Sequence, residues 1–317
     1  MIAEKLWQTE IDGTFLGAFF SIPGKQTCVL VRRNKSPALT GIDNRGEIIW
    51  DREFAFDSVD SFIPFRTFLY LDGTAIRKVD PANGRLVTER RLDDRVQVMP
   101  PSTAGPTYGS QDDIIGVHPD SLETNWNWKS PGGTFVTGDH LISYQKSGEI
   151  TIVDVTDCMK TTRVRGPANN RYGLAVHLLD DLLVQIYWMS RFAVDLRTGE
   201  LAWRIPDDRH GTHERIVFDG RTAYSAWHDL KAIDLRTGQV SWCSKLPHRI
   251  ETQPYVYSKK VYVGTKDGGV HAVDAETGQV LWSFNVDYDP VAVQPRSRGE
   301  VVVLGWEVVS CYQVEES

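Results

Sequence analysis

Cysteine is scarce in this sequence, and long apolar runs are missing. The 317 residues include four cysteines, Cys28, Cys158, Cys243 and Cys311, which form neither a Cys-x-x-Cys nor an adjacent Cys-Cys pair. Such spacing is typical of reduced, mostly buried thiols, so we expect a cytoplasmic protein without a disulfide framework. No run of 18 apolar residues occurs, and the start, MIAEKLWQTE, lacks the basic and apolar segments of a secretory signal. These absences predict no export and no membrane partner.

Positive charge is also in deficit. Lysine and arginine number 35 against 42 aspartate and glutamate residues, which gives a formal net charge of −7. Proteins that bind nucleic acid usually carry a basic stripe, and none is visible, so no nucleic-acid partner is expected. The 41% share of hydrophobic residues is too large for a disordered chain and predicts a folded core.

Known catalytic signatures are missing as well. The sequence has no Gly-x-Ser-x-Gly elbow, no phosphate-binding glycine loop and no His-Glu-x-x-His motif. Acidic pairs such as Asp180-Asp181 fall in expected turns, where solvated aspartate is common. His210-x-x-His213-Glu214 has two histidines at a ligand spacing, but it lies on a loop and no further ligand is evident. We therefore expect no metal, no cofactor and no enzyme activity.

The sequence does contain an internal repeat. Eleven-residue segments that begin at Ala193, Ala232 and Ala272 share the pattern Ala-x-Asp-x-x-Thr-Gly-x-x-x-Trp. Weaker copies place the aspartate at Asp43, Asp80, Asp120 and Asp154, so that successive aspartates lie 34 to 41 residues apart. A period near 40 residues is typical of one four-stranded blade of a β-propeller.

The motif itself predicts a turn followed by a tryptophan ring that packs between two blades. The aspartate can accept hydrogen bonds from the backbone of the turn, and the glycine can adopt positive φ. The tryptophan then lies on the fourth strand, where its ring can pack against a neighbouring blade. The tryptophans at this position are Trp7, Trp50, Trp128, Trp203, Trp242 and Trp282.

The two ends of the chain complete the count of blades. Val308–Val314 occupies a third-strand position, and Glu4–Trp7 supplies the missing fourth strand. We predict an all-β chain, a single β-propeller domain over residues 1–317, with eight four-stranded antiparallel blades closed by pairing of the N- and C-terminal strands. Seven blades are the alternative, because the copies at Asp120 and Asp154 are weak.

These segments resemble the repeats of the quinoprotein (PQQ-dependent) alcohol dehydrogenase-like β-propellers, a superfamily that includes the outer-membrane assembly lipoprotein of the BamB type. The resemblance covers essentially the whole chain and is strongest from Asp195 to Trp282. It implies an eight-bladed propeller with tryptophan-docking motifs. The dehydrogenases carry an adjacent Cys-Cys pair in the quinone pocket, and the lipoproteins carry a lipobox cysteine after a signal; this sequence has neither. The resemblance therefore implies the fold without the quinone.

The candidate binding residues lie on the face that propellers generally use. Seven residues before each aspartate falls the turn between the second and third strands, on the loop face. Three tryptophans occupy this turn, Trp188, Trp227 and, in the split blade, Trp306. Their polar and aromatic companions are Tyr187, His228, Asp229, Arg209 and His210. Exposed tryptophan beside polar groups is typical of an interface hot spot, whereas the alternative is that these rings plug the channel.

These features favour a non-catalytic, monomeric protein that binds another protein through its loop face. It would serve as a scaffold, or as an inhibitor such as an immunity protein that occludes a toxin. The long connection from Leu92 to Pro106, with Pro100-Pro101, is expected to be an extended, solvent-facing arm. The alternative function is an enzyme or a protein that binds a small ligand such as a sugar in the central channel, because aromatic platforms also suit sugar rings.

Overall fold

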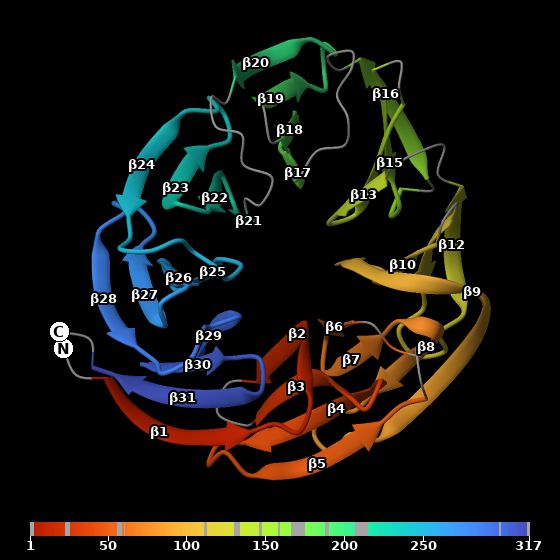
Figure 1. Ribbon diagram of the computed structural model, residues 1–317. Coiled ribbons are helices and arrows are strands. Elements are labelled where there is room, and N and C mark those ends of the chain that lie inside the picture. Colours follow the sequence, from red (N-terminus) through yellow and green to blue (C-terminus); the bar gives the residue numbers. More distant parts are fainter. Residues whose placement is uncertain are drawn as a thin grey trace. The chain divides into compact units, whose positions relative to one another are not determined.

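The fold consists of β-strands throughout the described part of the chain. The computed structural model describes residues 3–22, 26–55, 59, 61–110, 113–129, 134–145, 148–157, 159–165, 175–187, 190–206, 215–297 and 299–315. Within these ranges every regular element is a strand, which confirms the predicted all-β class (Figure 1). No helix in them is long and apolar enough to cross a membrane.

The chain divides into two compact units. The N-terminal unit combines Thr9–Gln145 with Ile150–Arg163, and the C-terminal unit combines Met1–Gln8, Lys146–Glu149 and Val164–Ser317. The single domain expected over residues 1–317 stays a prediction.

The N-terminal unit holds two four-stranded sheets and one seven-stranded sheet. The first sheet has the order β2 (Thr14–Ile22), β3 (Gln26–Arg33), β4 (Ser36–Asp43) and β5 (Ile48–Glu53). The seven-stranded sheet runs through β6 (Phe62–Phe65), β7 (Phe68–Leu71), β8 (Gly73–Val79), β9 (Leu86–Ser102), β10 (Gly105–Gly109), β11 (Asp113–Val117) and β12 (Thr124–Lys129). The third has the order β13 (Thr134–Thr137), β14 (His140–Tyr144), β15 (Glu149–Asp154) and β16 (Lys160–Arg165).

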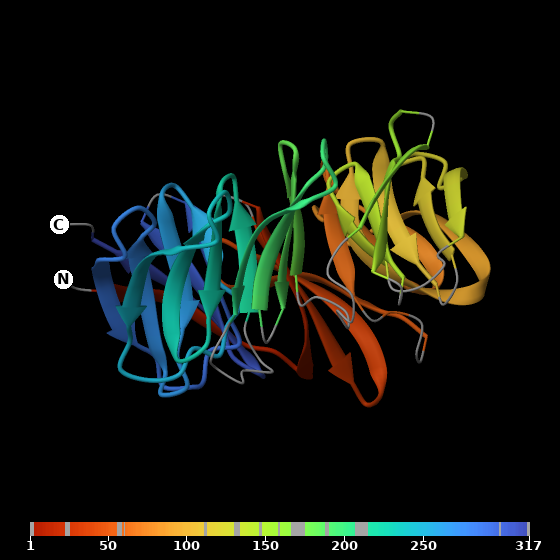
Figure 2. The same cartoon turned by 90° about the horizontal axis from the view of Figure 1, so that it is seen from above.

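The C-terminal unit holds four sheets of four strands, whose strands lie side by side in Figure 2. The first has β17 (Ala175–Leu179), β18 (Leu182–Tyr187), β19 (Ser190–Asp195) and β20 (Leu201–Pro206). The second has β21 (Arg215–Asp219), β22 (Thr222–Ala226), β23 (Asp229–Asp234) and β24 (Val240–Lys245). The third has β25 (Tyr255–Tyr257), β26 (Lys260–Gly264), β27 (Gly269–Asp274) and β28 (Val280–Asn285). The fourth has β29 (Ala292–Ser297), β30 (Glu300–Leu304), β31 (Val308–Val314) and β1 (Ala3–Glu10).

The last of these sheets confirms the predicted pairing of the chain ends. Strand β1 pairs with β31, so the first and last strands of the sequence lie next to each other (Figure 1). Trp7, on β1, is buried, and the guanidinium carbon of Arg296 lies 5.9 Å from the centre of its ring.

The expected arm from Leu92 to Pro106 is wrong, because most of it is strand. The first half of β9 pairs with β8, and the second half pairs with β10, with Met99 opposite Thr107 (Figure 1). One strand therefore closes the set β6–β9 and opens the set β9–β12, and the two sets form a single sheet. Pro100 and Pro101 are tolerated because this end of β9 pairs with β10 alone, as at a sheet edge.

The aspartate turns form as predicted. Asp274 Oδ1 accepts hydrogen bonds from the Glu276 N–H at 3.1 Å and from the Thr277 N–H and hydroxyl at 2.8 Å each. Gly278 follows at φ +75° and donates its N–H to the Asp274 carbonyl at 2.9 Å. The hydrogen bonds from Thr277 hold the pKa of Asp274 below its ordinary value. The turns at Asp195 and Asp234 have the same backbone hydrogen bonds to the aspartate, and at Asp234 the Thr237 hydroxyl donates as well.

The turn assigned to Asp120 begins two residues earlier, at His118. The imidazole Nδ1 of His118 accepts from the N–H groups of Asp120 (3.3 Å) and Ser121 (3.4 Å), as the aspartate carboxylate does elsewhere. Leu122 occupies the glycine position at φ +61° and donates its N–H to the His118 carbonyl at 2.9 Å. Asp120 instead accepts from Lys78 Nζ at 2.8 Å. Histidine replaces aspartate here because an imidazole nitrogen is also an acceptor.

The tryptophan of this repeat is accordingly Trp126, and the assignment of Trp128 was wrong. Trp126 pairs with Gly116 across β11 and β12, in the register that places Trp282 opposite Ala272. Trp128 lies two residues further along the same face, and both rings pack on the cluster around Ile114.

Trp203 and Trp242 each pack against the aspartate turn of the following sheet. A Cβ added at Gly238 would come within 2.5 Å of the Trp203 ring, and one at Gly278 would come within 2.6 Å of the Trp242 ring. The Trp242 indole N–H also donates to the carbonyl of Ala275 at 3.1 Å. These contacts join neighbouring sheets within the C-terminal unit.

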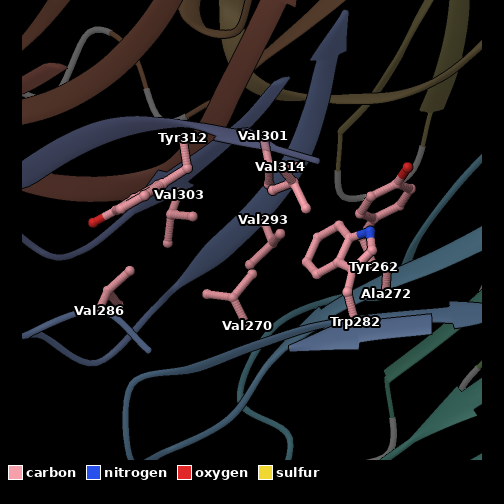
Figure 3. Close-up of a cluster of buried hydrophobic side chains, with 10 residues drawn as sticks. All are labelled: Tyr262, Val270, Ala272, Trp282, Val286, Val293, Val301, Val303, Tyr312 and Val314. Carbon is pink, nitrogen blue, oxygen red and sulfur yellow. The ribbon is translucent and has the colours of Figure 1, made fainter. Parts of the chain in front are cut away.

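Side chains between the sheets complete the core of the C-terminal unit. Figure 3 shows Trp282 of β28 facing Val293 and Val301 of the next sheet. The ring of Trp282 also lies 5.8 Å from that of Phe284. Burial of such aromatic and β-branched side chains supplies most of the stabilisation between sheets.

Candidate functional site

The loop ends of three adjacent sheets form a continuous strip in the C-terminal unit, here called the loop band. It consists of the turns β22–β23, β26–β27 and β30–β31 and the connections β24–β25 and β28–β29. Backbone hydrogen bonds join successive parts: Ile250 N to Trp227 O (2.8 Å), Lys266 N to Arg249 O (3.0 Å), Val286 N to Gly268 O (2.9 Å) and Val291 N to Leu304 O (2.7 Å). The band is therefore a hydrogen-bonded surface rather than a set of separate loops.

Trp227 lies on the β22–β23 turn, as the sequence predicted, and packs on a neighbouring connection. The guanidinium carbon of Arg249 lies 4.6 Å from the centre of the Trp227 ring. Arg249 is held in turn by Glu251, whose Oε1 accepts from Arg249 Nε at 2.9 Å. The neighbouring His228 ring meets the Trp227 ring edge to face at 5.5 Å, with His228 exposed and Asp229 half-buried. Trp227 is thus fixed in place, with part of its surface open to solvent.

Trp306 lies on the β30–β31 turn, also as predicted, and is far more open. Its side chain is 58% exposed, the largest fraction among the large hydrophobic residues of the described chain. Its neighbour Gly305 packs so closely on Tyr288 that a Cβ there would lie 2.7 Å from the Tyr288 ring. The Tyr288 hydroxyl donates to the Val303 carbonyl at 3.2 Å, which fixes the connection beside the turn. The exposed ring of Trp306 therefore stands on a rigid support.

A chain of polar groups supports the β26–β27 turn in the middle of the band. Asp267 lies 3.1 Å from His248 Nε2, and its Oδ1 accepts from the Thr265 hydroxyl at 2.7 Å. The Thr265 oxygen lies 3.4 Å from Nε2 of the buried His271, whose Nδ1 lies 2.7 Å from Ser283 Oγ. Burial tends to raise the pKa of Asp267, but the Thr265 hydrogen bond and the charge of His248 outweigh it, so the net shift is downward. Burial lowers the pKa of His271.

Gly269 makes room for this polar chain. A Cβ at Gly269 would lie 2.3 Å from Thr265 Oγ1 and 2.7 Å from His271 Nε2. Because every member of the chain already has a partner on the strands or turns of this sheet, the arrangement serves to hold the turn in place. Within the described ranges no group of three or more His, Cys, Asp or Glu side chains is placed to hold a metal ion.

The structure describes the remaining predicted site residues only in part. Tyr187 is the last residue of β18, and its side chain is not described. Trp188, Arg209 and His210 lie outside the described residues. Arg249 and Tyr288, which the structure places in the band, were not among the predicted binding residues. The only signal for them was their place in connections between repeats, where sequence spacing alone does not say which turn they contact.

Comparisons with known proteins agree with this architecture. Residues 192–312 match the sequence profile of the family described as outer membrane protein assembly factor BamB. No curated protein sequence matches the chain. The crystal structure of BamB from Moraxella catarrhalis superimposes with a TM-score of 0.65 at 15% identity, covering 100% of this chain and 99% of that one. The computationally designed Ika8 protein superimposes with a TM-score of 0.71, also at 15% identity, covering 98% and 100%.

These comparisons confirm the resemblance to BamB-type repeats and show the fold to be that of a BamB-like β-propeller. The matched range, residues 192–312, contains all three strong repeat segments. At 15% identity, the structural likeness concerns the fold and not the activity.

Proposed function

With a BamB-like propeller fold as the premise, we propose that this chain is a non-catalytic binding protein. It contacts a partner protein through the loop band, with Trp306 on the β30–β31 turn as the main anchor and Trp227 on the β22–β23 turn as a second one. The observation that carries the proposal is the 58% exposure of Trp306 on a turn held by Tyr288. Leaving an indole ring in water is unfavourable, and tryptophan is enriched among the residues that dominate binding at protein interfaces.

The surroundings of the two rings support an interface of this kind. Binding surfaces combine aromatic anchors and arginine with a polar rim. Here the Arg249 guanidinium covers Trp227 and the exposed His228 ring meets it edge to face. The exposed His248 lies next to Asp267 in the same band. The backbone bonds that link the turns pre-order this surface, so little conformational entropy is lost on binding.

The number of blades, the role of the interaction and the location in the cell are part of the same proposal. We favour eight blades, since the seven-stranded sheet contains two sets of four strands that share β9. We favour a scaffold role over that of an immunity-type inhibitor, because residues 192–312 match the sequence profile of a family described as an assembly factor. A cytoplasmic location is supported by Cys28 and Cys311, which are buried thiols outside any disulfide.

The test compares Trp306→Ala with Tyr257→Ala as a matched control. Tyr257 is also a large exposed side chain of this unit (48%), but it lies at the β25–β26 turn, at the opposite end of its sheet from the loop band. Proteins of the source cell that bind the immobilised chain would be quantified by mass spectrometry for the wild type and both variants. We expect a partner that is lost at least about tenfold with Trp306→Ala and kept with Tyr257→Ala. A partner retained equally by both variants, or none at all, would contradict the proposal.

A further inference from the structure

The strand that carries the tryptophan position ends each described sheet, here called the closing strand. The closing strands are β1, β5, β12, β16, β20, β24 and β28. Each has a strand neighbour on one side only within the described residues, so half of its backbone N–H and C=O groups point away from the sheet. Such an edge can accept another strand, and natural proteins usually protect it with charged side chains or proline.

Six of the seven closing strands are protected in this way. Each contains at least one charged residue: Lys5 in β1, Asp51 in β5, Lys129 in β12, Lys160 in β16, Arg204 in β20 and Lys245 in β24. Strand β28 is the exception, because its sequence VLWSFN has neither charge nor proline. Val280 and Leu281 on this strand are 37% and 41% exposed. The edge of β28 is thus both apolar and unprotected.

We propose that β28 pairs with β28 of a second copy of this chain, antiparallel and about a two-fold axis. The third sheet of the C-terminal unit would then continue into its counterpart as one sheet. We choose a second copy as the partner because two identical β28 strands can pair with each other in antiparallel orientation. An antiparallel pair related by such an axis places residues of the same sheet face opposite each other. An uncharged strand meets no repulsion in that arrangement.

The irregular start of β28 selects the register. A bulge lies between the pairs Ala272–Trp282 and Val273–Val280, so the regular part of β28 begins at Trp282. Centring the axis on Ser283 places Trp282 of one copy opposite Phe284 of the other, and the two Ser283 residues opposite each other. Aromatic pairs across strands are favourable, and no charged side chain is involved.

The edge is already ordered before pairing. The Trp282 and Phe284 rings are stacked, with centroids 5.8 Å apart, and Trp282 belongs to the buried cluster shown in Figure 3. Pairing therefore costs little side-chain entropy. One short strand pair buries less than the roughly 1,000 Å² of a stable interface, so the dimer should be weak and concentration-dependent. It should also be insensitive to salt, since no ion pair forms.

The first test is sedimentation velocity of the full chain from about 1 to 200 µM, where a weak dimer would form. We expect a monomer–dimer equilibrium for the wild type, unchanged by added salt. Leu281→Lys should weaken it at least about tenfold, because the substitution brings the edge protection found on the other closing strands. The matched control is Ala202→Lys, the equivalent exposed position of β20 beside the same bulge, which should leave the equilibrium unchanged. Melting temperatures of both variants exclude loss of fold as the cause.

The second test is a cross-link at the predicted axis. Ser283→Cys is introduced together with Cys243→Ser, which removes the exposed thiol among the described cysteines. Directly opposed residues of an antiparallel pair have Cα atoms about 4.5–5.5 Å apart, which suits a disulfide. Mild oxidation should therefore yield a covalent dimer that Leu281→Lys suppresses. A chain that stays monomeric at all concentrations, a dimer that persists with Leu281→Lys, or no cross-link at residue 283 would overturn the proposal.

Discussion

Replacing Gly238 by alanine should destabilise the chain more than replacing Gly199, although the two glycines hold the same position in equivalent turns. Their φ angles are +71° and +72°. They differ in what lies next to them: a Cβ at Gly238 would come within 2.5 Å of the Trp203 ring, whereas a Cβ at Gly199 would meet nothing within 4 Å. The pair therefore separates backbone strain from the contact between sheets.

The size of the difference follows from two separate costs. An alanine at this positive φ costs about 1–2 kcal/mol in either turn. At Gly238 the Trp203 ring must also move, and overpacking of this kind costs about 1–3 kcal/mol more. For a domain of this size each kcal/mol lowers the melting temperature by about 2–4 °C. Gly238→Ala should therefore melt at least about 2 °C below Gly199→Ala.

Calorimetry of the two variants, repeated in a Trp203→Ala background, completes the test. Without the Trp203 ring, alanine at either position should lower the melting temperature by about the same amount, since only the backbone strain is left. Equal melting temperatures for the two variants in the presence of Trp203 would refute the idea that tryptophan packing on the next turn links the sheets.

Two further predictions concern particular side chains. Burial lowers the pKa of His271 below its ordinary 6.5, so its contribution to stability is complete above pH 6.5 and is lost as the pH falls through the lower folded value. The difference in melting temperature between wild type and His271→Gln should therefore shrink from pH 8 to pH 5; a constant difference would contradict this. Leu122→Gly relieves a φ of +61° but removes a fully buried side chain, so it should destabilise by about 1–3 kcal/mol in urea unfolding, whereas a gain in stability would show that strain dominates.

The sequence predicted the fold well wherever the turn chemistry was explicit. Asp195, Asp234 and Asp274 with their threonines and glycines define strand ends without further information, because the turn makes its own hydrogen bonds. The prediction failed at His118 and Leu122, where other residue types take over the same geometry. It failed again at Pro100-Pro101, because proline indicates a loop unless the strand is known to have an unpaired side.

The candidate site was predicted in part. A spacing of seven residues, counted back from Asp234 and from Gln313 in the split blade, located Trp227 and Trp306 on the correct turns, since strands of equal length place equivalent residues at equivalent heights. That spacing does not say how much of each tryptophan ring is covered by other side chains. Arg249 covers Trp227 from a connection 22 residues further along the sequence, whereas Trp306 has most of its surface free. Such long-range packing depends on tertiary contacts, which a single sequence does not reveal.

The shared strand β9 limits how this chain can be recombined. In many repeat proteins a single unit can be duplicated, deleted or exchanged, because the cut falls in a loop. Here a cut between the second and third repeats would fall within β9 (Leu86–Ser102), in the middle of a sheet. Cutting before β9 would deprive the second repeat of its outer strand, and cutting after β9 would deprive the third repeat of its inner strand. Any graft must therefore carry Phe62 through Lys129 as one cassette, and evolution would have had to gain or lose those two repeats together.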